Sequence, residues 1–253
     1  MAVDEAVLES AGRGVSLPTL RLYDWQPACL SLGYAQSIKD VDLPRLRAHG
    51  WELVRRATGG RAILHVDELT YSIAAHPGER LVQGSILESY QRLAQALIAA
   101  VRALGLPVEM EENAPLASAA NGPVCFEVPS AYEIVVAGKK LIGSAQARKK
   151  EGVLQHGTFP LYGDLTRITR ALVFPDEQAR AAAAQKLLAR ATTAETVSGR
   201  LIGWDEAAQA FVQAFETGLD LKLEPGELTP AETARAAELV QHKYDHSAWT
   251  ERS

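Results

Sequence analysis

The sequence contains little cysteine and no long apolar run. Only two of its 253 residues are cysteines, Cys29 and Cys125, which are too few for a disulfide framework and fit a reducing cytosol. No uninterrupted apolar stretch approaches the roughly 20 residues that span a bilayer. The first ten residues include Asp4 and Glu5 and lack a basic start, so they do not form a secretory signal. We therefore expect a cytoplasmic protein that does not enter a membrane.

The sequence also lacks a net positive charge and a cluster of metal ligands. A net charge of −5 argues against nucleic acid as the main partner. The six histidines are scattered, and none forms a close pair with cysteine or histidine in a known metal-binding spacing. The GxxxxGK[ST] and GxGxxG spacings of phosphate-binding loops are missing as well. We expect neither a metal site nor a bound cofactor.

The remaining composition is that of a globular α+β protein. A length of 253 residues with 47% hydrophobic content suits a single domain over residues 1–253. We expect it to be rich in strands to about residue 163 and helical from about residue 164. Predicted helices cover 2–10, 44–50, 85–105, 165–173, 177–191, 204–219 and 230–245. Ser85 and Glu88 have the spacing of a capping box at the start of the helix over 85–105. Predicted strands cover 19–25, 28–35, 107–110 and 153–163, with a hairpin over 130–150 that turns at Ala137-Gly138.

The central stretch, residues 52–73, predicts strand, glycine turn, strand, acidic turn and strand. The turn is Thr58-Gly59-Gly60-Arg61, and adjacent glycines let a backbone take positive φ and approach a ligand closely. Arg55, Arg56 and Arg61 frame this turn. Because the turn leads into a strand rather than a helix, no helix dipole assists anion binding, and the turn alone does not imply ATP.

Cys125 is a candidate nucleophile. It follows a stretch, residues 112–123, that is poor in large apolar side chains and is interpreted as a loop. A thiol is well suited to take an acyl group reversibly from a thioester, provided that nearby cations lower its pKa. Alternatively, Cys125 is a small hydrophobic residue packed beside Phe126. Cys29, within a strand-like run, is interpreted as a packing residue.

Lys140 is a second candidate. Strand alternation places Lys140, Ile142 and Ser144 on one face, so the lysine would point into a pocket beside a Gly-Ser-Ala stretch. The alternative, a solvated hairpin tip, is favoured for Lys139.

Two histidines and a cationic run have two interpretations each. His65 and His156 either line a site or serve the structure. The run Arg148-Lys149-Lys150, together with the arginines of the glycine turn, either docks an acidic partner or forms a solvated face.

Several long motifs resemble one superfamily. RRATGGRAILHVDELTYSI and GKKLIGSAQARKKEGVLQHGTFPL are similar to two signature blocks of the lipoate–protein ligase, biotin ligase and octanoyltransferase superfamily. PVCFEVPSAYEI and HKYDHSAW resemble the LipM branch of the octanoyltransferases. The resemblance covers nearly the whole chain, and its motifs occur in the same order.

The resemblance implies a fold and a reaction. The fold would be a mixed central β-sheet flanked by helices, as in the catalytic domains of class II aminoacyl-tRNA synthetases and biotin ligases. The reaction would move an octanoyl group from acyl carrier protein to a lysine of a lipoyl-domain protein, such as the glycine cleavage H protein or a dehydrogenase E2. No ATP is consumed in this route.

The resemblance also implies residue roles. Cys125 would carry the acyl thioester, and Lys140 would lower the pKa of that thiol and position the acyl carbonyl. The substrate would lie against Arg55, Thr58, Gly59, Gly60, Arg61, His65, Gly143, Ser144, Ala145 and His156.

Departures from the family pattern bear on the rival functions. An ATP-dependent lipoate–protein ligase would typically carry a GGG-type turn and an additional C-terminal domain, whereas this sequence has GGR followed by DELTYS. The family usually has a strand before the helix at 2–10, and this sequence begins at the helix. The third candidate is a non-catalytic module that binds acyl carrier protein. We expect the transferase.

Overall fold

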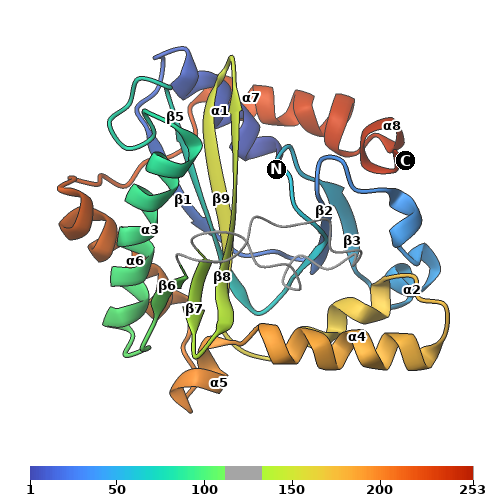
Figure 1. Cartoon of the computed structure of the whole chain (residues 1–253). Coiled ribbons are helices and arrows are strands. Elements are labelled where there is room, and N and C mark those ends of the chain that lie inside the picture. Colours follow the sequence, from blue (N-terminus) through green and yellow to red (C-terminus); the bar gives the residue numbers. More distant parts are fainter. Residues whose placement is uncertain (112–132, 253) are drawn as a thin grey trace.

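The structure, a computed structural model, describes residues 1–111 and 133–252 (Figure 1). These residues form two β-sheets flanked by helices, which confirms the predicted α+β class. Within the described ranges, no helix is both long and apolar enough to cross a bilayer.

The larger sheet has six antiparallel strands. In spatial order these are β1 (Thr19–Tyr23), β5 (Glu68–Ala75), β9 (Gly152–Pro160), β8 (Lys139–Lys149), β7 (Glu133–Val136) and β6 (Glu109–Glu111). The predicted hairpin is confirmed as β7–β8. Its turn residues Ala137 and Gly138 have φ values of 49° and 73°, as a type I′ turn requires.

The smaller sheet is mixed and has three strands in the order β3 (Glu52–Arg55), β2 (Cys29–Leu32) and β4 (Ile63–His65). β2 runs parallel to β3 and antiparallel to β4. The strands on either side of the glycine turn are therefore not paired with each other, because β2 lies between them. Likewise, β1 and β2 follow each other in the chain but belong to different sheets.

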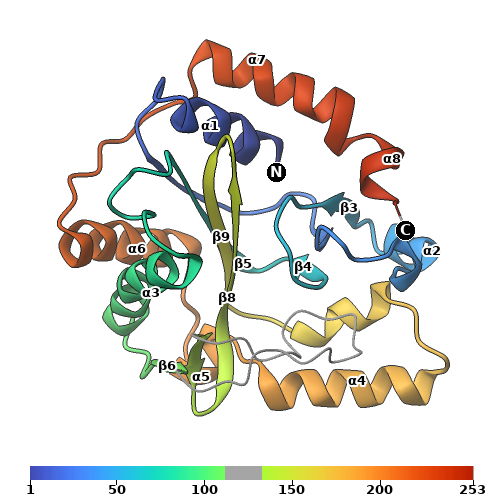
Figure 2. The same cartoon turned by 45° about the horizontal axis from the view of Figure 1, so that its top comes forward.

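Two long helices cover one face of the larger sheet. They are α3 (Ile86–Ala103) and α6 (Trp204–Leu219), and they lie side by side in Figures 1 and 2. The predicted capping box of α3 is confirmed, since Ser85 and Glu88 exchange hydrogen bonds. Leu69, Tyr71 and Ile73 alternate along β5 and point into the core beneath these helices.

The remaining helices surround the smaller sheet and the other face of the larger one. Near the termini lie α1 (Ala2–Gly12), α7 (Pro230–Leu239), the π-helical turn η4 (Val240–Tyr244) and α8 (Ser247–Thr250). At the other end lie η1 (Ile38–Asp40), α2 (Leu43–Ala48), η3 (Leu165–Ala171) and α4 (Glu177–Arg190). The short helix α5 (Ala194–Ser198) instead packs against the core beneath α3 and α6. The predicted helices are confirmed, although residues 165–171 form a 3₁₀-helix rather than an α-helix.

We call the face of the larger sheet that is turned toward the smaller sheet the inner face. It carries Glu68, His156 and Thr158. Glu68 contacts His65 of β4, and His156 contacts Thr58 of the glycine turn. The inner face and the glycine turn therefore position the candidate site.

Candidate functional site

A β-bulge turns Lys140 toward the inner face. Ile134 pairs with Ile142, but the next residue of β7, Val135, pairs with Lys140, so β8 contains one extra residue at this point. Directly paired residues share a face, and neighbouring residues of a regular strand do not. Lys140 therefore lies on the face opposite to Ile142. The expectation that Lys140, Ile142 and Ser144 share one face is wrong, because the bulge interrupts the alternation.

Lys140 forms a buried ion pair. Its Nζ lies 2.5 Å from Oε1 of Glu133, and the two side chains are only 6% and 7% exposed. Lys139, in contrast, donates to the backbone carbonyl of Leu188 at 2.8 Å, near the surface. Lys140 is thus not part of a solvated hairpin tip. It is a cation held inside the molecule by a carboxylate.

The Gly-Ser-Ala stretch is divided between the two faces of β8. Gly143 pairs with Thr158 and Ala145 pairs with His156, so Gly143 and Ala145 lie on the inner face. Ser144 lies on the opposite face. There its Oγ is 2.6 Å from the hydroxyl of Tyr71, which belongs to the core beneath α6.

The close approach of Tyr71 and Ser144 depends on a glycine between them. Gly157 of β9 pairs with both residues across the sheet. A Cβ at Gly157 would lie 2.6 Å from Cε1 of Tyr71 and 2.8 Å from Oγ of Ser144. The Ser144 hydroxyl is therefore engaged by the core face rather than presented beside Lys140.

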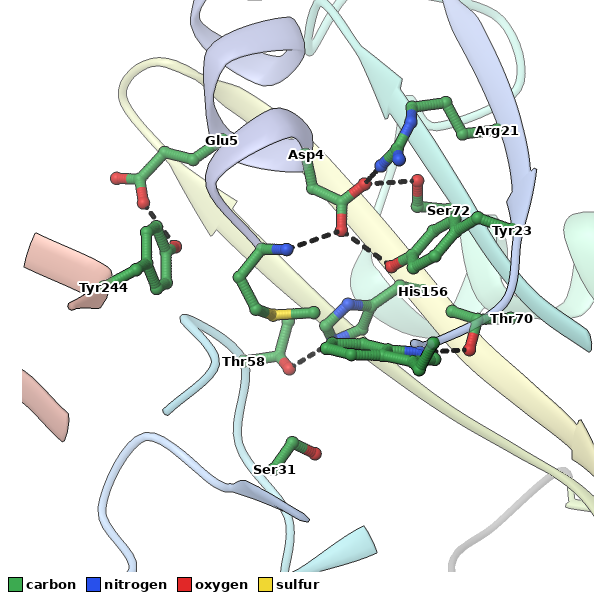
Figure 3. Close-up of polar contacts among 12 residues, drawn as sticks. Asp4, Glu5, Arg21, Tyr23, Ser31, Thr58, Thr70, Ser72, His156 and Tyr244 are labelled. Carbon is green, nitrogen blue, oxygen red and sulfur yellow. Dashed lines mark hydrogen bonds and ion pairs between the residues drawn. The ribbon is translucent and has the colours of Figure 1, made fainter. Parts of the chain in front are cut away.

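The glycine turn lies against the inner face (Figure 3). Thr58 Oγ1 is 2.5 Å from Nε2 of His156, and both side chains are buried. Gly60 has a φ of 94°, which confirms that the turn needs positive φ. A Cβ at Gly33 would lie 1.8 Å from the carbonyl oxygen of Gly60, so the chain after β2 passes directly against the turn.

A polar network fixes the turn from the side of the smaller sheet. Arg56 donates to the carbonyl oxygens of Gly59 and Arg61 at 2.9 and 2.7 Å. It also donates to Ser31 Oγ at 3.0 Å. The carbonyl oxygens that define the turn are thereby held by a buried guanidinium.

The same network continues to β5. Nε2 of His65 is 2.8 Å from Ser31 Oγ, and its Nδ1 is 2.7 Å from Oε1 of Glu68. The ring of His65 also stacks on Trp25 at a centroid distance of 4.4 Å. Both ring nitrogens of His65 thus contact buried protein groups, and these contacts fix the ring between Ser31 of β2 and Glu68 of β5.

His156 is neutral at the pH of a cell. Burial lowers its pKa to about 3, the nearby Asp4 opposes this shift, and the Arg56 cation adds to it. A neutral imidazole carries one donor and one acceptor nitrogen, so it can accept a hydrogen bond from the Thr58 hydroxyl or donate one to it. His156 therefore orients neighbouring groups and does not supply a charge.

Asp4 forms a polar anchor beside His156 (Figure 3). Its carboxylate accepts hydrogen bonds from Arg21, from Tyr23 at 2.9 Å and from Ser72 at 2.7 Å. Burial alone would raise the pKa of Asp4, but the amine of Met1 and the Arg21 cation outweigh it and hold that pKa below its ordinary value. The anchor ties α1 to β1 and β5 behind the site.

Arg55 was predicted to contact the substrate, but its side chain contacts the backbone of the protein itself. The side chain is fully buried, and its guanidinium is directed at backbone carbonyls of the protein. The acceptors are Gly33, Tyr34, Gln36, Trp249, Thr250 and Arg252. The indole Nε1 of Trp249 donates back to the Arg55 carbonyl at 3.0 Å. Arg55 therefore holds the C-terminal segment against β3.

The cations considered for one docking surface do not all lie at the surface. Arg55 and Arg56 are buried. Arg148 donates to the carbonyl of Val82 at 2.6 Å and to Ser89 Oγ at 2.7 Å, so it serves the fold. Strand alternation places Arg148 on the face of β8 opposite to Ala145, toward α3, whereas the glycine turn lies against the inner face. Arg148 and the arginines of the turn therefore lie on different sides of the larger sheet.

The two cysteines have different outcomes. Cys125 lies outside the described residues, so its predicted role stays a prediction. Cys29 is confirmed as a packing residue, since it is 5% exposed in β2. Burial raises the pKa of its thiol to about 12, which leaves it without nucleophilic character near neutral pH.

Glu133 is the functional candidate that sequence reasoning missed. The signal was a single carboxylate two positions before Val135, at the start of the apolar run EIVV. A glutamate on a buried strand requires a partner, and the nearest lysine across a tight hairpin is the natural one. Among the residues that the structure describes, no group of three or more acidic, histidine or cysteine side chains is arranged to hold a metal ion.

Comparisons with known proteins agree with this architecture. The family model for the lipoyl protein ligase A/B catalytic domain matches residues 1–216. A protein named Octanoyltransferase LipM from Brevibacillus brevis is 40% identical over 255 residues, which cover 98% of this chain and 92% of that protein. Another protein of that name, from Moorella thermoacetica, is 41% identical, and the matched region spans 100% of this chain and 93% of that protein.

Solved structures show the same fold. The bipartite lipoate protein ligase from Thermoplasma acidophilum superimposes with a TM-score of 0.79 at 26% identity, covering 99% of this chain and 89% of that one. A lipoate-protein ligase A bound with ATP superimposes with a TM-score of 0.78 at 25% identity, covering 99% and 92%. The chain belongs to the lipoyl protein ligase A/B catalytic-domain family and, within it, to the octanoyltransferases of the LipM group.

Proposed function

We propose that this enzyme transfers an octanoyl group from acyl carrier protein to a lysine of a lipoyl-domain protein through a thioester on Cys125. The observation that carries the proposal is the similarity, over essentially the full chain, to proteins named Octanoyltransferase LipM. The acceptor would be the glycine cleavage H protein or a dehydrogenase E2. The reaction would take place in the cytoplasm, where a free thiol persists.

Two acyl transfers make up the reaction. In the first, the Cys125 thiolate attacks the carrier thioester, a new carbon–sulfur bond forms, and the phosphopantetheine thiolate leaves and takes a proton from solvent. In the second, the neutral amine of the acceptor lysine attacks the Cys125 thioester. The carbon–sulfur bond breaks, and the amine's surplus proton passes to the departing thiolate. Each step exchanges one acyl bond for another, so no ATP is required.

The described residues support this chemistry. Lys140 supplies a buried ammonium on the inner face, where it can stabilise the Cys125 thiolate or the oxyanion of a tetrahedral intermediate. Gly143 and Ala145 present a narrow backbone surface along the same face, which suits an extended apolar chain. Gly59 and Gly60 would form the facing wall, held by Arg56.

Intact-mass measurement tests the proposal. The enzyme is incubated with octanoyl-acyl carrier protein without ATP or lipoate, and we expect one octanoyl adduct that hydroxylamine removes. Cys125→Ala should abolish the adduct, whereas Cys29→Ala, the matched control at the buried cysteine, should retain it. An adduct that survives Cys125→Ala would overturn the thioester route.

Other results would identify the rival functions. If no adduct forms but ATP and lipoate together release pyrophosphate, the protein is a lipoate–protein ligase like its structural neighbours. Tight binding of the carrier without either reaction would indicate a non-catalytic binding module.

A further inference from the structure

We propose that Glu133 is the positioning residue of the transfer reaction: its carboxylate fixes the direction of the Lys140 ammonium on the inner face. The inference rests on the proposed function, in which Lys140 assists Cys125. It adds a residue whose role is defined by its effect on Lys140 rather than by contact with the acyl group.

Strand geometry places the two side chains together. Glu133 and Val135 lie on the same face of β7, and Val135 is paired with Lys140 across the bulge. Without the extra residue in β8, Lys140 would point toward α3 and α6. The bulge and the carboxylate thus act together: one turns the lysine inward, and the other receives its ammonium at 2.5 Å.

The backbone of Lys140 is fixed on its other side as well. Its carbonyl accepts a hydrogen bond from the amide of Thr192 at 3.0 Å, and it forms a parallel bridge with Ala191. The main chain of Lys140 is therefore held between β7 and the segment after α4. What remains adjustable is the four-carbon side chain, which has many rotamers.

An ion pair removes this freedom. An ammonium has three N–H donors in tetrahedral directions, so directing one at Glu133 sets the directions of the others. Both groups are more than nine-tenths buried, and in such surroundings a charged side chain without its partner is strongly disfavoured. Glu133 therefore keeps the Lys140 cation on the inner face instead of letting it reach solvent.

A competing role for Glu133 makes an opposite prediction. If its carboxylate acted only as a negative charge near the nucleophile, it would disfavour the thiolate, and removing it would make Cys125 more reactive. If it positions Lys140, removing it should make Cys125 less reactive. The sign of the change therefore separates the two roles.

The experiment compares Glu133→Gln with the wild type. Without acyl donor, the rate of Cys125 alkylation by iodoacetamide is followed against pH by peptide mass spectrometry. We expect the midpoint of this profile to move to higher pH in Glu133→Gln. In single-turnover acylation we expect the rate to fall by about 10- to 100-fold, with the KM for the carrier within about threefold of the wild type. A change confined to folding would not displace the midpoint.

Two further variants sharpen the test. Glu133→Asp keeps the charge and should recover part of the acylation rate, even if Glu133→Gln proves too unstable to assay. Glu227→Gln, at an exposed glutamate between α6 and α7, is the matched control and should behave as the wild type.

Three results would overturn the inference: a midpoint that does not move, a midpoint that moves to lower pH, or Glu133→Asp being as slow as a charge-removing variant. A wild-type enzyme that forms no Cys125 adduct at all would instead defeat the proposed function, so the two failures are distinguishable.

Discussion

Thr58 Oγ1 lies 2.5 Å from Nε2 of His156, although the two residues are 98 positions apart in the chain. This contact joins the glycine turn to β9 at the level where His156 pairs with Ala145 of β8. The glycine turn is therefore fixed against the larger sheet. The buried hydrogen bond to His156 holds it on the side of the inner face, and Arg56 holds it on the side of the smaller sheet.

Removing the Thr58 hydroxyl should lower both stability and activity. Thr58→Val has nearly the same shape but leaves a buried imidazole nitrogen without its partner, which costs about 1–3 kcal/mol. We expect this loss in the free energy of unfolding measured in urea, together with a lower kcat/KM for octanoyl transfer. Thr58→Ser, which keeps the hydroxyl, should lose less than half as much unfolding free energy as Thr58→Val. Equal losses in the two variants would mean that the methyl group matters rather than the hydrogen bond.

His156 should make the protein less stable in acid. Its pKa is about 3 when folded, below the ordinary value of 6.5, so the folded state favours the neutral ring. The corresponding stability is complete above pH 6.5 and is lost as the pH falls from 6.5 toward 3. The contribution to the slope is at most about 1.4 kcal/mol per pH unit.

The measurement is chemical denaturation at several pH values from 7 down to 4. His156→Gln, which cannot gain a proton, should show a smaller decrease in the free energy of unfolding over this interval. If the two proteins lose stability in parallel, other groups account for the acid sensitivity.

Arg55 should prove to be a structural residue that holds the C-terminus. Its guanidinium donates to carbonyls of two segments that are distant in the sequence, including Gly33 and Arg252 at 2.9 and 2.8 Å. Arg55→Lys cannot reproduce this planar set of donors, and we expect a loss of about 3 kcal/mol or more in unfolding free energy. Backbone amide hydrogen exchange of residues 245–252 should be faster in Arg55→Lys than in the wild type.

A surface arginine supplies the comparison for Arg55. Arg45 is 46% exposed, and its guanidinium binds the half-buried Asp42 and the exposed Glu177. Arg45→Lys should therefore change stability by less than about 1 kcal/mol. Should Arg55→Lys unfold normally yet raise the KM for the acyl donor, Arg55 would be a substrate contact after all.

Local patterns predicted most elements of the fold, but not how they combine. The capping box at Ser85 and the hairpin turn at Ala137-Gly138 depend on neighbouring residues, so the sequence was sufficient for both. The placement of β2 between β3 and β4 depends on pairings across more than 20 residues, which periodicity does not encode.

The side chains of the site show the same difference between what neighbouring residues determine and what distant residues determine. Strand alternation placed Ser144 beside Lys140 because it assumes a regular strand, and the bulge opposite Ile134 breaks that regularity. Arg55 looked like a ligand contact because its partners, near residue 250, are distant in sequence. Resemblance to a family suggested the candidate residues, and only the fold shows which face each described one occupies.

Two glycines of the site should respond differently to a methyl group. A Cβ at Gly33 would lie 1.8 Å from the carbonyl oxygen of Gly60, whereas a Cβ at Gly59 meets nothing within 4 Å among the described residues. Because the clash at Gly33 is with backbone, Gly33→Ala must displace the turn, and we expect it to cost about 2–3 kcal/mol in unfolding free energy. Gly59→Ala should leave that free energy within about 1 kcal/mol of the wild type.

Activity then shows whether Gly59 lines the acyl site. If it does, the added methyl group occupies space needed by the octanoyl chain. Gly59→Ala should then raise the KM for the octanoyl donor several-fold more than for a shorter hexanoyl donor, while the thermal midpoint stays unchanged. If octanoyl and hexanoyl transfer are affected equally, Gly59 faces away from the chain, and the acyl wall must be formed by Gly143 and Ala145 on β8 instead.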